Sequence, residues 1–290
     1  MMREIRYALR LIGRNPGLSL VAVLSLALGI GANATIFSFA DALLLQQPPV
    51  AQPQRLVEVY TRDNSPQAAL NGLYPLSYPD WKDFSERTQT LSGLAIYNPG
   101  TEVNARVGGG VETWSGQLVS ANYFAVLGIK PVIGRWFTPP EAAAAGQGAL
   151  VVLSYAAWQA KFGGERSVVG RELRLNGIPY TVVWVAPRGF AGMFAGLECD
   201  FWAPVTMAAR LGSPNVLGER GNRGQFAVGR LKPGVTMAAA SAEMDSIQRA
   251  LSRQYPNVDD PRWGAWRCRW GWCPPRPAAS CVRARRCWRW

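Results

Sequence analysis

The chain has 290 residues, a net charge of +12 and no histidine. The lack of histidine excludes Ser-His-Asp and Cys-His catalysis and every His-ligated metal site. Of the net charge, residues 262–290 contribute +8 and residues 1–16 contribute +3, which leaves +1 for the remainder. Because that remainder is nearly neutral, it lacks the electrostatic footprint of a protein with a nucleic-acid partner.

The N-terminus combines a basic segment with a long apolar run. Residues 1–16 form the basic segment, which is amphipathic because Ile5, Leu9 and Ile12 fall on one helical face. From Leu18 to Phe39 no residue is charged. These 22 residues would span about 33 Å as a helix, close to the ~30 Å core of a bilayer. We expect a membrane anchor over 17–45, with membrane anchoring by Arg3, Arg6, Arg10, Arg14, Leu18 and Phe39.

The orientation of this anchor follows from its charges. Arginines before a span favour the cytoplasmic side. The chain is therefore expected to cross the cell (inner) membrane once, with the N-terminus in the cytoplasm and the residues after Asp41 outside it. A cleaved signal peptide is the alternative, with Ala32-Asn33-Ala34 as its cleavage triplet. A retained anchor is favoured because the apolar run continues beyond that triplet to Leu45.

Residues 46–261 show alternating strand and helix patterns. A Pro-rich exit covers 46–54, and a helix is expected from Ser77, its N-cap, to Leu91. The last expected helix runs from about Thr236 to Tyr255 with an apolar stripe at spacings of 3 and 4, for which packing on a sheet is favoured over a coiled-coil seam. Strands are expected at Leu56–Thr61, Thr101–Val107, Val111–Val119, Ala149–Leu153, Glu172–Leu175, Pro179–Ala186, Asp200–Val205 and Gly224–Leu231, with short helices at Ala121–Leu127 and from Ser154, and an Asn176-Gly177 hairpin turn.

These patterns predict an α+β fold: one N-terminal transmembrane helix followed by a two-lobed extracytoplasmic domain. The smaller lobe, about 149–205, is expected as an insertion in the first, since the strand-helix pattern restarts there after a Pro- and Ala-rich link.

Residues 262–290 differ from the rest in composition. They hold eight arginines, six tryptophans and four cysteines, and no acid. Three interpretations compete: a metal or disulfide knot, an Arg/Trp segment for the membrane surface, and out-of-frame translation of GC-rich DNA. The third is favoured because the segment has no period of 2 or 3.6 and its cysteines form no CxxC pair, so the ordered protein is expected to end near Pro261.

A search for chemistry in the sequence finds no assembled site. There is no phosphate-binding GxxxxGK[ST] loop, and the chain is expected to have no catalytic, cofactor-binding or metal residues and no cofactor. Cys199 is expected to be a small buried residue. Glu198 and Asp200 are expected on a solvated loop, and the cluster of Arg220, Arg223 and Arg230 on a solvated surface, with an anion site as the alternative.

Seven segments resemble one family in the same order. They are RYALRLIGRNPGLSLVAVLSLALGIGANATIFSFADALLL, SYPDWKDF (77–84), SANYFAVLGIKPVIGRWFTPPE (120–141), VVLSYAAWQAKFGG (151–164), SVVGRELRLNGIPYTVVWVAP (167–187), DFWAPV (200–205) and GRLKPGVTMAAASAEM (229–244). Over residues 3–261 the chain resembles MacB/FtsX-like ABC transporter permeases, in particular the orphan, often duplicated bacterial subgroup.

The resemblance implies a MacB-like periplasmic core domain at 46–261, with a porter-like lobe and a smaller inserted lobe. It also implies a non-catalytic permease that transmits movement across the membrane for export (efflux) or signalling. The implied partners are the lipid bilayer, a separate cytoplasmic ATPase and a second permease copy. The later helices of the family are not in this sequence, so we expect a truncated permease; a stand-alone single-anchor adaptor or binding protein is the alternative, and an exported enzyme is a third, less favoured class.

Overall fold

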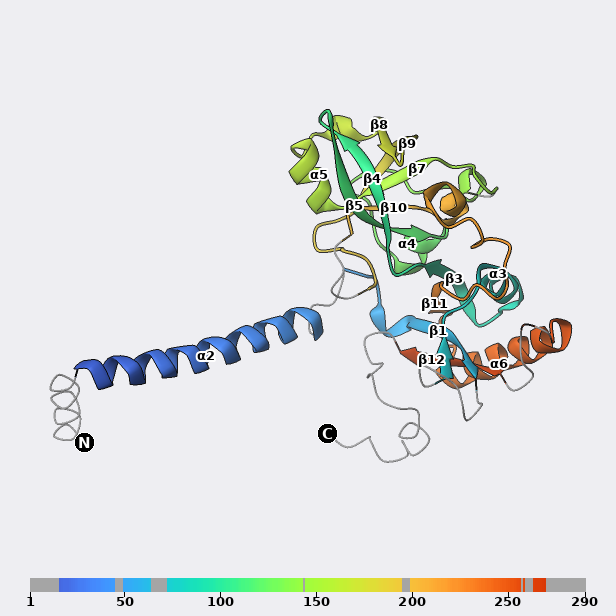
Figure 1. Cartoon of the computed structure of the whole chain (residues 1–290). Coiled ribbons are helices and arrows are strands. Elements are labelled where there is room, and N and C mark those ends of the chain that lie inside the picture. Colours follow the sequence, from blue (N-terminus) through green and yellow to red (C-terminus); the bar gives the residue numbers. More distant parts are fainter. Residues whose placement is uncertain are drawn as a thin grey trace. The chain divides into compact units, whose positions relative to one another are not determined.

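The computed structural model describes residues 16–44, 49–63, 72–142, 144–194, 199–256, 258 and 263–269 (Figure 1). The chain divides into two compact units, Met1–Gln47 and Pro48–Trp290. The described part of the first unit is one helix, α2 (Pro16–Leu44), of 29 residues. Its only charged residue is Asp41.

Six strands of the second unit form a closed ring. In order around the ring they are β5, β10, β7, β9, β8 and β4, and the parallel pair β10–β5 closes it. The ring buries alternate residues, because successive side chains of a strand point to opposite faces. Its strands are β4 (Thr101–Val107), β5 (Gly110–Val119), β7 (Leu150–Leu153), β8 (Glu172–Leu175), β9 (Ile178–Val185) and β10 (Phe201–Pro204).

Close packing inside the ring depends on glycine at one position. A Cβ on Gly116 of β5 would lie 2.3 Å from the ring of Phe201 on β10. The α5 helix (Tyr155–Phe162) contributes Trp158 to the same core, and its Phe162 ring meets Trp114 edge-on at 6.4 Å between centroids. The ring of strands is therefore a filled barrel.

An open sheet continues from the barrel. Its strand order is β3–β11–β1–β12, and Tyr97 of β3 pairs with Val119 of β5 to join the two parts. Helices α3 and α6 pack on one face and α4 on the other (Figure 1). The elements are β1 (Leu56–Asp63), β3 (Leu91–Tyr97), β11 (Phe226–Leu231), β12 (Trp263–Arg269), α3 (Tyr78–Arg87), α4 (Tyr123–Leu127) and α6 (Met237–Gln254), with the short β2 (Leu73–Tyr74) on β1 and β6 (Ile133–Gly134) on β9.

The remaining short helices are 3-10 turns. They are η1 (Pro53–Arg55), η3 (Pro139–Ala142), η4 (Arg166–Val168) and η5 (Val205–Leu211).

Several local expectations are confirmed. Ser77 and Ser154 cap α3 and α5, accepting hydrogen bonds from Asp80 N at 3.2 Å and Ala157 N at 3.1 Å. The Asn176-Gly177 turn has φ values of 48° and 79°, the left-handed pair that a type I′ hairpin needs. The apolar stripe of α6 packs into the core, as expected for a helix on a sheet.

The helix expected over Ser77–Leu91 is too long. It ends at Arg87, because Thr88 is extended, and Leu91 is instead the first residue of β3. Glu243 of α6 accepts hydrogen bonds from Gln89 N at 2.6 Å and Thr90 N at 3.0 Å. These long-range contacts hold residues 88–90 out of the helix, and no local sequence pattern predicts these contacts.

Two features of the sheet concern the expected boundaries at 149–205 and 261. The barrel contains β4 and β5 as well as strands from the expected lobe at 149–205, so that lobe is hydrogen-bonded into one continuous sheet. Beyond the expected limit at 261, β12 pairs antiparallel with β1 over the whole of Val57–Asp63. The division into two lobes stays a prediction, while the regular backbone extends past Pro261.

Candidate functional site

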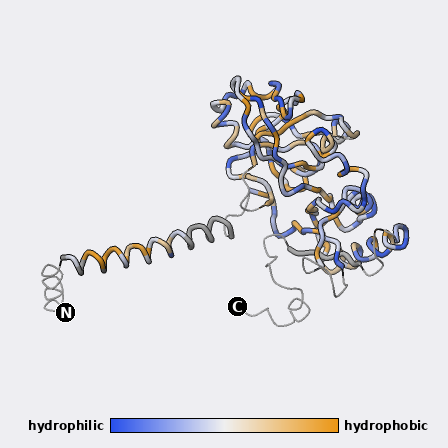
Figure 2. Tube along the Cα trace, in the orientation of Figure 1, coloured by the Kyte–Doolittle hydropathy of each residue, from blue (hydrophilic) through white to orange (hydrophobic). Residues whose placement is uncertain are grey.

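The residues expected to anchor the chain are mostly beyond what the structure describes. Arg3, Arg6, Arg10 and Arg14 lie outside the described residues, and for Leu18 and Phe39 only the backbone, within α2, is described. Hydrophobic residues predominate along the coloured part of α2 (Figure 2), and its Leu20–Ile30 segment carries exposed apolar side chains. Among the residues that the structure describes, no helix is both long and apolar enough to qualify as a membrane span.

The chain enters the second unit through a set of contacts that we call the entry clamp: Ala51, Arg55, Val126, Leu127 and Arg230. Arg230 of β11 donates from Nε to Val126 O at 2.6 Å and from Nη2 to Ala51 O at 2.7 Å. Ala51 N donates to Leu127 O at 3.0 Å. Through η1, Arg55 Nε reaches the carbonyl of Leu231 at 3.0 Å. The clamp joins the entering chain to both α4 and β11.

A glycine permits the close approach within the entry clamp. Gly128, the C-cap of α4, has φ 66°, and a Cβ there would lie 2.6 Å from the Cβ of Ala51. Burial lowers the pKa of Arg230, and the neighbouring charge of Arg55 lowers it further. Because its acceptors are backbone carbonyls rather than acids, Arg230 has a structural role: it connects the backbone at Ala51 to the backbone at Val126.

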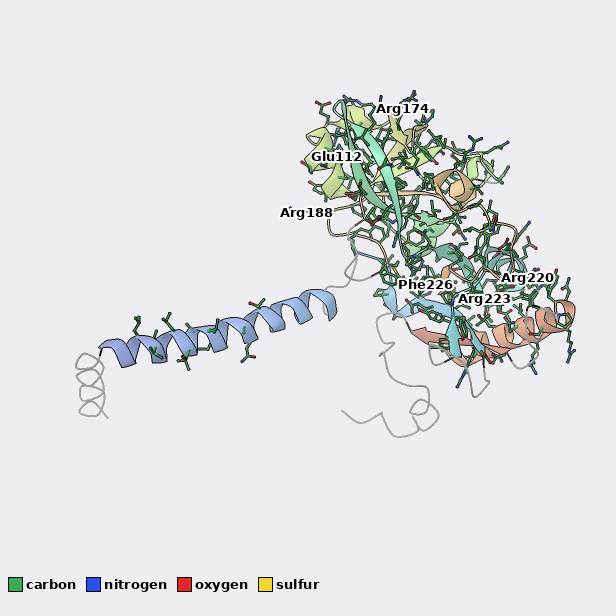
Figure 3. All side chains as sticks on the ribbon, in the orientation of Figure 1. Glu112, Arg174, Arg188, Arg220, Arg223 and Phe226 are labelled. Atoms are coloured by element: carbon green, nitrogen blue, oxygen red, sulfur yellow. The ribbon has the colours of Figure 1, made fainter. Side chains whose placement is uncertain are left out.

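A second set of contacts, which we call the exit latch, consists of Asp80, Asp83, Arg220, Arg223 and Tyr255. Asp80 is fully buried and pairs with both Arg220, at 2.5 Å, and Arg223, at 3.0 Å. Arg220 also pairs with Asp83 at 2.7 Å, and its guanidinium carbon lies 3.8 Å from the ring centroid of Tyr255. Figure 3 shows the two arginines close to α6.

The exit latch fixes the end of α6. Tyr255 is the C-cap of that helix, whereas the two acids belong to α3 and the two arginines to the loop before β11. Burial alone would lower the pKa of Arg220, but its bonds to Asp83 and Asp80 outweigh burial and raise it. The chain is therefore held by charged contacts where α6 ends, as it is held by the entry clamp where β1 begins.

The arginines of the expected cluster do not share a site. Arg220 and Arg223, only 14% and 9% exposed, face Asp80, while Arg230 belongs to the entry clamp. The expectation of a solvated surface was wrong for Arg220 and Arg223, which pair with acids of α3 instead. The anion-site alternative stays a prediction.

Cys199 and Asp200, two further candidates from the sequence, are held in the fold by burial and by a hydrogen bond. Cys199 is buried, as expected, and burial raises the pKa of its thiol, which disfavours the reactive thiolate. Asp200 accepts a hydrogen bond from Ser115 N at 3.0 Å, so it is tied to β5 rather than solvated on a loop. Glu198 lies outside the described residues. Within the described ranges, no group of three metal-ligating side chains comes together.

The comparisons place this architecture among known folds. Structures similar to this chain include the periplasmic region of MacB from Actinobacillus actinomycetemcomitans, with 16% identity, TM-score 0.53, and coverage of 75% of this chain and 89% of that one. A domain of a putative permease protein from Porphyromonas gingivalis has 12% identity, TM-score 0.54, and coverage of 77% and 92%. The extracellular domain of the noncanonic ABC-type transporter YknZ from Gram-positive bacteria has 13% identity, TM-score 0.51, and coverage of 73% and 99%.

The chain thus has a mixed α/β fold similar to that of the periplasmic region of MacB and of the extracellular domain of YknZ. The model of the MacB-like periplasmic core domain matches residues 19–247, and this chain belongs to that family. The recognition of a MacB/FtsX-like permease made from the sequence is confirmed. No curated protein matches the chain.

Proposed function

We propose that the chain is a non-catalytic permease subunit of an ABC-type export or mechanotransmission complex. Its core domain lies outside the cytoplasm and is anchored in the inner membrane by α2 with the N-terminus inside. A cytoplasmic ATPase and a second permease copy are its partners. The observation that carries the proposal is the family match over residues 19–247, which begins inside α2 and ends inside α6.

The membrane anchor draws support from α2. A helix of 29 residues is about 44 Å long, which exceeds the ~30 Å hydrocarbon core, and its described apolar side chains are exposed. The four arginines that precede it favour a cytoplasmic N-terminus.

Transmission of movement draws support from the two sets of contacts at the ends of the core domain. A displacement of the chain before Ala51 passes through the entry clamp to α4 and β11. A displacement after Tyr255 passes through the exit latch to α3. Since β11, β3 and β5 are hydrogen-bonded in one sheet that includes the barrel, movement at either end would shift the domain as a body. The proposed role of the core domain is mechanical and includes no chemical reaction.

The location is tested with the full chain in a bacterial host. A membrane-impermeant maleimide should label the cysteines of the 262–290 tail in intact spheroplasts, because that segment follows the core domain. In an Arg10→Cys variant, with the tail cysteines changed to serine, labelling should require lysis. Recovery of the chain in the soluble fraction, or tail labelling only after lysis, would contradict the proposal.

A single-anchor adaptor remains the second candidate, and β12 favours it. This strand belongs to the tail yet pairs with β1 along seven residues, as a genuine part of a fold would. Binding of a peptide of residues 262–290 to anionic vesicles, lost in high salt, supports the adaptor. Co-purification of the full chain with an ATPase supports the permease.

A further inference from the structure

The outer face of the barrel carries two directly opposed arginines. Arg106 of β4 and Arg174 of β8 are register partners in an antiparallel pair, and both are exposed. Like charges in this position are destabilising. Nothing in the packing requires them there, because the inward positions of both strands are occupied by apolar residues.

The acids nearby compensate only part of this charge. Glu172 pairs with Arg174 at 2.9 Å. Glu112, on the hairpin strand next to β4, is paired instead with Lys161 of α5 at 2.5 Å. In the part of the chain that the structure describes, no acid pairs with Arg106. Arg106, Arg174 and Glu172 together therefore carry a net charge of +1 on this face.

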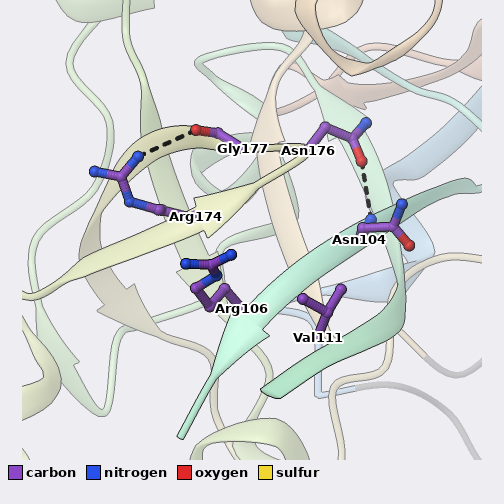
Figure 4. Close-up of a pocket in the computed structure, with 6 residues that line it drawn as sticks. All are labelled: Asn104, Arg106, Val111, Arg174, Asn176 and Gly177. Carbon is purple, nitrogen blue, oxygen red and sulfur yellow. Dashed lines mark hydrogen bonds between the residues drawn. The ribbon is translucent and has the colours of Figure 1, made fainter. Parts of the chain in front are cut away.

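These arginines line a cavity of about 480 Å³ with Asn104, Val111, Asn176 and Gly177 (Figure 4). Figure 4 shows the guanidinium groups on one side and the two asparagines on the other. The volume falls within the range of small-molecule pockets, about 300–1,000 Å³.

Hydrogen bonds hold the turn on one side of this open pocket. Asn176 Oδ1 accepts from Asn104 N at 2.9 Å, and Asn176 N donates to Asn104 O at 2.8 Å, which fixes the turn against β4. Arg174 Nη1 donates to Gly177 O at 3.3 Å. The exposed Val111 side chain, 62% accessible, supplies an apolar edge. The turn that carries Asn176 and the side chain of Arg174 are thus positioned before any ligand arrives.

We propose that this cavity is a binding site for a small soluble anion that carries a carboxylate or phosphate group. Guanidinium groups match the planar or tetrahedral oxygens of such anions with paired hydrogen bonds. An oxyanion between Arg106 and Arg174 relieves their repulsion, and the side-chain amide of Asn104 supplies a further donor. The site does not depend on the function proposed above, since it lies on the barrel and away from the entry clamp and exit latch.

The test is calorimetric titration of the full chain, in nanodiscs of zwitterionic lipid, with sodium phosphate and with sodium citrate at constant ionic strength. The matched control is Arg188→Gln. Arg188 is also exposed but follows the far end of β9, an eight-residue strand whose first residue adjoins Gly177. The tail arginines are common to all variants, so only differences between variants are interpreted.

Wild type and Arg188→Gln should bind at least one of the two anions equally. Arg106→Gln should weaken that binding about tenfold, and the double Arg106→Gln, Arg174→Gln variant should abolish it. Arg106→Lys, which keeps the charge and loses the paired geometry, should be intermediate and serves if the glutamine variant unfolds. Equal binding in all variants, or none in wild type, overturns the proposal. If phosphate and citrate bind in zwitterionic nanodiscs but not in nanodiscs that contain anionic lipid, the site is assigned to a lipid headgroup instead, and the proposal of a soluble anion is overturned.

Discussion

The contribution of the exit latch to stability can be measured by removing the charge of Asp80. Asp80→Asn keeps the size of the side chain and the hydrogen bond that its backbone N donates to Ser77 Oγ, but removes the fully buried charge that Arg220 and Arg223 share. Removing one member of a buried ion pair costs about 3–5 kcal/mol. Because Arg220 keeps Asp83 and is 14% exposed, we expect the lower end, about 3 kcal/mol.

For a domain of this size that loss lowers the melting temperature by about 6–12 °C, from about 2–4 °C per kcal/mol. The assay is urea and thermal unfolding of the full chain in detergent, followed by near-ultraviolet circular dichroism of the buried tryptophans. Asp83→Asn, at a more exposed position, should cost only about 1 kcal/mol. Combining Asp80→Asn with Arg220→Gln should cost less than the sum of the single changes. A melting temperature of Asp80→Asn within 2 °C of wild type would refute the reasoning.

Three further predictions concern other contacts. Burial raises the pKa of Glu243, but hydrogen bonds from residues 88–90 outweigh burial and lower the pKa. The stability that these bonds provide is present above the unfolded-state pKa and is lost as pH falls through the folded-state pKa. Urea midpoints should therefore drop more steeply below about pH 4.5 in wild type than in Glu243→Gln. Gly134→Ala should cost about 3 kcal/mol, because φ is 93° and the new Cβ would meet a backbone carbonyl at 2.1 Å, whereas Gly189→Ala, with φ 82° and open space, should cost about 1 kcal/mol in the same unfolding assay. Arg230→Gln should lose about 1.5 kcal/mol and speed proteolysis within 48–55, while Arg188→Gln changes neither; unchanged cleavage would argue against the entry clamp.

Local chemistry made much of this fold predictable. Serine caps, the Asn-Gly turn and the glycine after α4 each determine a backbone conformation through neighbouring residues alone. Alternation over Thr101–Val107 gave the correct strand bounds, since Val103 and Ala105 are buried while Glu102, Asn104 and Arg106 are exposed.

The contacts that make the sites were not predictable in this way. Asp80 and Arg220 are 140 positions apart, and nothing near either residue specifies the other. The parallel pairing of β10 with β5, which closes the barrel, likewise depends on how the whole core packs. The β12 strand escaped prediction because its composition is atypical, although the free edge of β1 offers unpaired backbone groups to any extended segment.

The position of β1 has a consequence for biogenesis. This strand is the first of the core domain to be made, yet its neighbours in the sheet, β11 and β12, are among the last: Leu56 pairs with Arg230, and Val57 with Arg269. Apart from its short pairing with β2, this strand therefore lacks its sheet neighbours during the synthesis of most of the domain. Such non-local pairing slows folding and leaves the nascent chain open to aggregation. The barrel strands, which pair over shorter separations, can form during that wait, and the early strand then completes the sheet last.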